Sequence, residues 1–302
     1  MTTSPEPKPV RRSDRIAAQS TRLAYRADAA LVGVTLVWGS TFVIVKGALG
    51  GASPFEFVAL RFGIGFITLA VLFHRRVMRL SRFELRAGAL IGVFLFLGYA
   101  FQTFGLQFTT AARAGFITGL SVLAVPLFAY IALRHRVGLG VIAGIALAAV
   151  GMYLLSFGGP IAVSLGDLLV FCCAMAFAAH IVSISAYAPR FDPISLAIVQ
   201  TGFVAALSSV VALAIERPIA APSSAAWVGA LYTGIVGTAA VLGVQTSVQR
   251  YTSPAHAALI FSLEPVFAAL FAYLLAGEVL GPSGWVGGVL ILGGMLVAEL
   301  KR

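Results

Sequence analysis

The chain has 302 residues, of which 60% are hydrophobic and only 11% are charged. This composition excludes an ordinary soluble globular protein, in which about a quarter of the residues carry a charge. The formal net charge of +10 does not indicate nucleic-acid binding, because the basic residues lie in short connections and no soluble domain gathers them on one surface.

The first predicted element is a basic tail, residues 1–28, which is rich in Pro, Ser and Arg and is expected to be flexible. Ten apolar segments follow it, each close to the ~20 residues that a helix needs to cross the hydrocarbon core of a bilayer. The predicted spans are 29–49, 55–73, 87–105, 112–133, 137–157, 165–185, 194–215, 225–245, 254–276 and 282–300. The sequence therefore predicts an all-α membrane protein with ten transmembrane helices and both termini on the same side.

The basic residues orient these predicted helices. If the N-terminus is cytoplasmic, every Lys and Arg except Lys46, Arg61, Arg113 and Arg217 falls on the cytoplasmic side. This distribution follows the positive-inside rule. We therefore expect a multi-pass protein of the bacterial inner membrane, with both termini in the cytoplasm.

The second half of the chain repeats the first half. Asp28 corresponds to Asp167 at an offset of 139 (167 − 28), and Gln102 corresponds to Gln245 at an offset of 143 (245 − 102). The basic segment 134–136 falls on a segment of the second copy that carries Glu278 instead. A repeat of five helices must enter the membrane from the opposite face, and the exchanged loop charges agree with that inversion.

The predicted domains are accordingly the tail, 1–28, and two inverted five-helix repeats, 29–157 and 158–302. Small residues on the last helix of each repeat predict close helix packing or a homodimer contact, or alternatively a flexible gate; they are Gly140, Gly144 and Ala148 in the fifth span and Gly284 and Gly288 in the tenth.

Several short motifs carry a family resemblance. They are Trp38-Gly39-Ser40-Thr41-Phe42 in the first span, Pro54 and Arg61 in the second, Glu264-Pro265 in the ninth, and Gly277-Glu278 at its end. Together with the duplicated five-helix unit they resemble the EamA family of the drug/metabolite transporter superfamily, from about residue 29 to residue 300.

The resemblance implies a secondary transporter that moves small metabolites, such as amino acids, across the inner membrane by alternating access. It does not identify the substrate. Two alternatives stay open: a flippase for lipids or lipid-linked sugars that uses the same helices, and a non-transporting membrane scaffold or sensor.

Charged residues inside the predicted spans are the strongest functional candidates, because a charge at the bilayer centre costs at least ~2.5–3.5 kcal/mol on insertion scales. Glu264 lies near the middle of its span, beside Pro265. It is a candidate for binding a cationic group or for coupling to protons; the alternative is a carboxyl that only fixes helix packing. Arg61 is a candidate for binding a substrate carboxylate, or it pairs with Glu56 one turn away.

Uncharged polar and aromatic residues complete the candidate site. Gln102 and Gln245 occupy equivalent repeat positions, and their amides suit a zwitterionic or polar substrate, although packing between helices explains them equally well. His180 is a candidate proton relay or a structural histidine. Trp38 and Tyr99 either line an apolar ligand face or belong to the helix core.

The sequence contains no motif for a catalytic triad, a bound metal or a phosphate-binding loop. We therefore predict no enzymatic activity, no cofactor and no metal site. The expected partners are a small metabolite, the lipid bilayer and protons, with the transport energy coming from a substrate gradient or the proton motive force.

Overall fold

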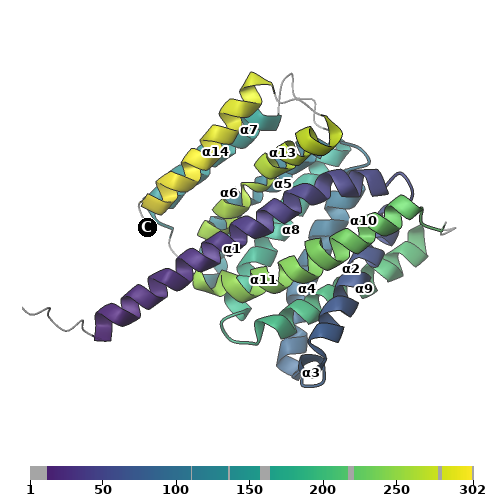
Figure 1. Ribbon diagram of the computed structural model, residues 1–302, viewed down its shortest axis with the longest axis horizontal. Coiled ribbons are helices and arrows are strands. Elements are labelled where there is room, and N and C mark those ends of the chain that lie inside the picture. Colours follow the sequence, from purple (N-terminus) through teal and green to yellow (C-terminus); the bar gives the residue numbers. More distant parts are fainter. Residues whose placement is uncertain are drawn as a thin grey trace, which may run out of the picture.

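The computed structural model describes residues 12–109, 111–134, 137–156, 164–216, 221–277 and 281–300. Over these residues the chain is helical, with short turns and no strand (Figure 1). The elements are α1 (Arg12–Ala48), α2 (Pro54–Leu72), α3 (His74–Val77), α4 (Arg82–Gly105), α5 (Ala111–Gly119), α6 (Ser121–Leu133), α7 (Leu139–Ser156), α8 (Leu165–Tyr187), α9 (Pro193–Ile215), α10 (Ser224–Gly234), η1 (Ile235–Ala240), α11 (Val241–Val248), η2 (Gln249–Tyr251), α12 (Pro254–Phe261), α13 (Glu264–Ala276) and α14 (Pro282–Leu300).

Seven helical segments among the described residues are long and apolar enough to cross a membrane. They are Arg22–Ala48, Pro54–Leu72, Arg82–Gly105, Leu165–Tyr187, Pro193–Ile215, Ser224–Tyr251 and Pro254–Leu275. The expected fourth and fifth spans contain shorter apolar helices, Ile117–Leu133 and Leu139–Leu154. The all-helical membrane fold is thus confirmed, whereas ten crossing helices in two inverted repeats stay a prediction.

The first helix is longer than expected. The tail was predicted to be flexible up to residue 28, but α1 begins at Arg12, and in Figure 1 its first turns extend beyond the bundle. Residues 12–28 contain neither Pro nor Gly and are rich in Ala and Arg, which favour helix. The apolar helix therefore continues N-terminally into this basic segment.

Two of the helical spans are broken at equivalent repeat positions. α5 ends at Gly119 and α6 begins at Ser121, while α12 ends at Phe261 and α13 begins at Glu264. In the second copy Pro265 has no N–H to continue the helical ladder, which explains the break there. Ser121 and Glu264 are related by the offset of 143 (264 − 121), so both copies begin a new helix at the same point of the repeat.

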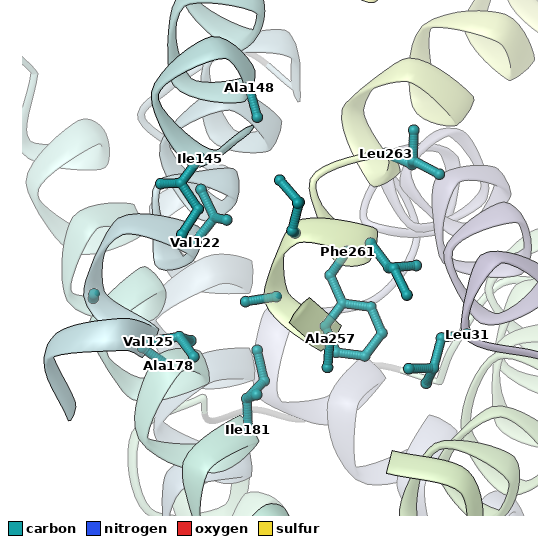
Figure 2. Close-up of a cluster of buried hydrophobic side chains, with 14 of the residues drawn as sticks. Leu31, Val122, Val125, Ile145, Ala148, Ala178, Ile181, Ala257, Phe261 and Leu263 are labelled. Atoms are coloured by element: carbon teal, nitrogen blue, oxygen red, sulfur yellow. The ribbon is translucent and has the colours of Figure 1, made fainter. Parts of the chain in front are cut away.

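A cluster of buried hydrophobic side chains joins the two halves of the chain. Figure 2 shows Leu31 of α1 and Phe261 of α12 facing Val125 of α6 and Ile181 of α8. Each of these side chains is less than 9% exposed. The cluster holds the broken helices α5–α6 and α12–α13 against the continuous helices beside them.

Both ends of the α2–α9 pair are fixed by charged groups. At the first end Glu216, the C-cap of α9, accepts hydrogen bonds from Phe55 N at 2.9 Å and Glu56 N at 3.0 Å, in the first turn of α2. At the other end Arg76 donates to Asp192, the N-cap of α9. The carboxylate at each end also interacts favourably with the positive end of a helix dipole.

Glycines set the distance between α7 and α14, which lie side by side at the edge of the bundle (Figure 1). A Cβ placed on Gly151 would lie 2.5 Å from Gly287 O, and one placed on Gly294 would lie 2.5 Å from Gly144 O. These two contacts are related by the repeat, since Gly144 and Gly151 correspond to Gly287 and Gly294. Small residues thus let the two backbones touch, as the sequence predicted for Gly144, whereas the predicted Gly288 has no atom within 4 Å of an added Cβ and the contact uses Gly287 and Gly294 instead.

We expect Gly294→Ala to lower the thermal stability of the purified protein. The new methyl overlaps the backbone of α7, and overpacking of this kind costs about 1–3 kcal/mol, more than the 0.5–1 kcal/mol that Ala gains over Gly in a helix. Gly288→Ala, on the same helix, is the matched control, because no atom lies within 4 Å of its added Cβ. Thermal unfolding in detergent measures the stability of both variants. Equal melting temperatures would contradict the conclusion that Gly294 sets the distance between α7 and α14.

Candidate functional site

The structure contains a cavity of about 880 Å³, a volume that includes its open mouth. It lies between α1, α2, α4, α8, α11 and the two broken helices α5–α6 and α12–α13. All residues that the sequence singled out for a site line it: Trp38, Arg61, Tyr99, Gln102, His180, Gln245 and Glu264. The structure thus brings the predicted residues together, while their roles stay predictions.

The cavity wall consists largely of equivalent positions from the two repeats. At the offset of 139 the lining pairs are Trp38 with Phe177, Thr41 with His180 and Phe42 with Ile181; at the offset of 143 they are Gln102 with Gln245, Thr118 with Phe261 and Ser121 with Glu264. The cavity therefore lies where the two halves of the chain face each other. The charged members have no charged counterpart in the other copy.

Arg61 is held in a fixed position on the cavity wall, and its side chain is only 3% exposed. Its Nε donates to Thr238 Oγ1 at 2.9 Å, and its Nη2 donates to Tyr99 OH and Gly237 O, each at 3.2 Å. The guanidinium carbon also lies 4.7 Å from the centre of the Tyr99 ring, a cation–π contact. None of these bonds uses Nη1, which leaves part of the guanidinium fork for a ligand.

The expected pairing of Arg61 with Glu56 is wrong. Glu56 accepts hydrogen bonds from the main chain and hydroxyl of Ser53, at 3.2 and 3.3 Å, and so belongs to the capping box at the start of α2. A helix start with Ser three residues before Glu satisfies its own amide groups in this way. The local signal for a capping box therefore outweighed the charge pairing that spacing alone suggested.

Two of the three hydrogen-bond partners of Arg61, Gly237 and Thr238, lie on a turn of π-helix, η1, between α10 and α11. Gly237 O in this turn also accepts a hydrogen bond from Trp38 Nε1 at 3.1 Å. A π-helical turn disturbs the regular α-helical ladder, and such turns occur often at functional sites. Thr238 and Gly237 were not singled out from the sequence; Gly237 in the middle of the eighth apolar segment was the available signal.

Glu264 faces the same cavity from the first residue of α13. Within the described part of the chain it forms no ion pair, and Arg61 is also without a direct ionic partner. The cavity thus carries one fixed cation and one carboxyl that are not neutralised by direct contact. Such an arrangement can bind a molecule that carries both a negative and a positive group.

The imidazole of His180, which lines the cavity, is joined to amide and hydroxyl groups behind it. His180 Nε2 lies 2.8 Å from Gln200 Oε1, and Gln200 Nε2 donates to Thr246 Oγ1 at 3.1 Å. The three side chains are at most 2% exposed and join α8, α9 and α11. Gln200 was not predicted; it is the repeat counterpart of Arg61 at the offset of 139, which could have drawn attention to it.

The two predicted glutamines have different surroundings. Gln102 Nε2 donates to Thr118 Oγ1 at 3.2 Å, whereas Gln245 Nε2 donates to Gln249 Oε1 at 3.1 Å. Lys46, which the sequence left outside the cytoplasmic set, is exposed at the end of α1 and does not line the cavity. Arg61 is therefore the cation available to a ligand among the described lining residues.

The described part of the chain is all-helical, contains helices long enough to cross a membrane, and holds a cavity lined by equivalent positions of the sequence repeat. The EamA-like transporter family matches the chain over residues 26–157 and 164–299, and the chain belongs to this family. A protein of Archaeoglobus fulgidus described as an uncharacterized transporter is 36% identical over 91% of this chain and 86% of its own length.

Two further similarities are more limited. The S-adenosylmethionine/S-adenosylhomocysteine transporter of Chlamydia muridarum is 31% identical over 41% of this chain and 40% of its own length. A crystal structure with 20% sequence identity superimposes with a TM-score of 0.78 over 92% of this chain and 99% of the other. This second similarity concerns the fold alone.

We expect Thr238→Val to lower the free energy of unfolding by about 1.5–3 kcal/mol, since it leaves the buried Nε–H of Arg61 without an acceptor. Thr35→Val is the matched control, because the equally buried Thr35 hydroxyl bonds only to Val32 O of its own helix, at 2.8 Å. Thermal unfolding of both variants in detergent measures the difference. Equal losses of stability would show that the Arg61–Thr238 bond has no special weight.

Proposed function

We propose that the protein is a secondary transporter that moves small zwitterionic metabolites, amino acids among them, across the bacterial inner membrane. The direction is export, and both termini are cytoplasmic. The observation that carries the proposal is the cavity itself, which is lined by equivalent positions of both repeats and holds one buried cation and one carboxyl. The metabolite binds there and the two halves move so that the cavity opens to one face at a time.

The packing of the helices supports alternating access. Two contacts between the halves occur twice, once in each direction of the repeat. The contact of α1 with α13 is equivalent to that of α8 with α6. The contact of α4 with α8 is equivalent to that of α10 and α11 with α1. α2 with α9, and α7 with α14, pair helices that are repeat counterparts of each other. In transporters built from inverted repeats, such equivalent contacts allow one half to rock against the other around a fixed site, and we propose the same movement here.

The chemistry of the lining residues supports a zwitterionic substrate. The planar guanidinium of Arg61 matches the geometry of a carboxylate, and the carboxyl of Glu264 suits a cationic group. Between them Trp38, Phe177 and Phe261 supply apolar wall for a side chain. One relative transports S-adenosylmethionine according to its name, and that molecule also carries an amino-acid group.

Glu264 and His180 are the proposed coupling residues, because both are titratable and both face the cavity. Glu264 binds and releases a proton as the cavity changes sides. His180, which is joined to Gln200, acts as the proton relay.

The test is uptake and efflux of a radiolabelled panel in proteoliposomes, with and without a pH gradient. The panel consists of the common amino acids and S-adenosylmethionine. We expect at least one compound to show flux that requires the gradient, and Glu264→Gln to lower this flux by roughly tenfold or more, the scale on which a missing proton-transfer group acts. Glu84→Gln is the matched control, since Glu84 is a capping residue at the start of α4 that does not line the cavity.

Flux that an uncoupler leaves unchanged and that Glu264→Gln retains would remove Glu264 from coupling and indicate a facilitator. Absence of flux for every compound of the panel would contradict a metabolite carrier of this class. In that case the same vesicles, loaded with fluorescent lipids, test the flippase alternative.

A further inference from the structure

One amide among the residues that line the cavity uses only half of its hydrogen-bonding capacity. Gln245 lines the cavity, and its side chain is completely buried. Its Nε2 donates to Gln249 Oε1 at 3.1 Å, but its Oε1 has no hydrogen-bond partner in the described part of the chain. Buried polar atoms are normally paired, so this oxygen is an unoccupied acceptor.

The orientation of the Gln245 amide follows from its neighbours. Gln249 lies in η2, is also completely buried, and places one end of its amide 2.6 Å from the main-chain oxygen of Ile181. A carbonyl oxygen only accepts hydrogen bonds, so the atom of Gln249 at that position must be Nε2. The same Nε2 donates to Ser185 Oγ at 2.8 Å.

The other end of the Gln249 amide is therefore Oε1, an acceptor. The atom of Gln245 that contacts it must then be the donor, Nε2, and Oε1 of Gln245 must point elsewhere. A main-chain carbonyl of α8 thus determines, through two amides, that the unpaired end of the Gln245 amide is an oxygen and not an N–H group.

The equivalent amide of the first repeat is not fixed in this way. The residue that corresponds to Gln249 at the offset of 143 is Leu106, so Gln102 has no oriented amide beside it. Gln102 contacts the hydroxyl of Thr118, which both donates and accepts, and either end of the Gln102 amide can occupy that contact. The two repeats therefore present an adaptable amide on one side of the cavity and a fixed acceptor on the other.

We propose that Gln249 is a positioning residue that sets the polarity of the substrate site. It holds Gln245 so that Oε1 accepts a hydrogen bond from an N–H group, such as an ammonium, of the transported molecule. This inference rests on the proposed function, because it takes the cavity as the transport site. It adds Gln245 of α11 as a hydrogen-bond acceptor for the cationic group that Glu264 is proposed to attract, and leaves the carboxylate end of the substrate to Arg61.

The experiment compares the binding of L-leucine and of N,N,N-trimethyl-L-leucine to the purified full-length protein by isothermal titration calorimetry. The trimethyl compound keeps the charge and the carboxylate but has no N–H to donate. The ratio of the two dissociation constants contains the added bulk and the lost hydrogen bond. Only the contribution of the lost hydrogen bond depends on Gln245.

We expect wild type to favour leucine, and Gln245→Leu and Gln249→Leu to reduce that preference roughly tenfold, which is the scale of one hydrogen bond to a charged donor. Ser185→Ala is the matched control and keeps the preference, because Gln249 retains its bond to Ile181 O. If Gln249→Leu does not fold, as judged by its melting curve, Gln245→Leu still removes the accepting oxygen directly.

Three results would overturn the proposal: no leucine binding to wild type, equal binding of the two compounds, or an unchanged preference in Gln245→Leu. Flux measurements with the metabolite panel separate this outcome from a failure of the proposed function. Leucine flux without an N–H preference contradicts only the hydrogen-bond assignment, whereas no flux for any compound contradicts transport of this class.

Discussion

The structure depends on one constraint, which is that main-chain polar groups in a lipid environment must find their partners inside the protein. Regular helix satisfies this demand by itself, but each interruption releases carbonyl or amide groups. At η1 the released carbonyl of Gly237 is bound by Trp38 and by Arg61. At the start of α2 the free amides are bound by Glu216 from the other half of the chain. Several of the polar side chains of this apolar chain therefore bind main-chain groups where the helices are irregular.

The same constraint explains why the cavity has its present position. Two helical spans break at equivalent points, at Ser121 and Glu264, and both points line the cavity. Irregular backbone is tolerated at membrane depth only when it is buried in protein or faces a polar space. The breaks, the π-helical turn and the cavity thus form one feature, to which the rest of the bundle supplies close helix contacts such as that between Gly151 and Gly287.

Much of the fold and the membership of the site could be predicted from the sequence. Long apolar segments predict helices, and charges or amides inside them are so costly that they mark a polar interior, which is why all the predicted candidates line one cavity. The partners of these residues could not be predicted. Arg61 bonds to Thr238, which is 177 positions away in the chain, whereas the sequence suggested its near neighbour Glu56.

Two predictions about local features were wrong or incomplete for related reasons. The start of α1 was predicted too late, because hydropathy marks the membrane-spanning part of a helix and not where the helix begins. Gln249 was overlooked because it lies at the end of its apolar segment, where a polar residue is unremarkable by composition. Its importance follows from a contact with α8 that no pattern within its own segment records.

The pairing of cavity positions has a consequence for how the repeat diverged. Aromatic and amide positions carry similar residues in both copies, as in Trp38 with Phe177 and Gln102 with Gln245. The charged positions differ, since Glu264 corresponds to Ser121 and Arg61 corresponds to Gln200. The cavity wall is thus similar in the two copies at its aromatic and amide positions and different at its charged positions. Under the proposed function, a substrate whose two charged groups are held at different positions of the cavity keeps one orientation relative to the bilayer throughout the transport cycle.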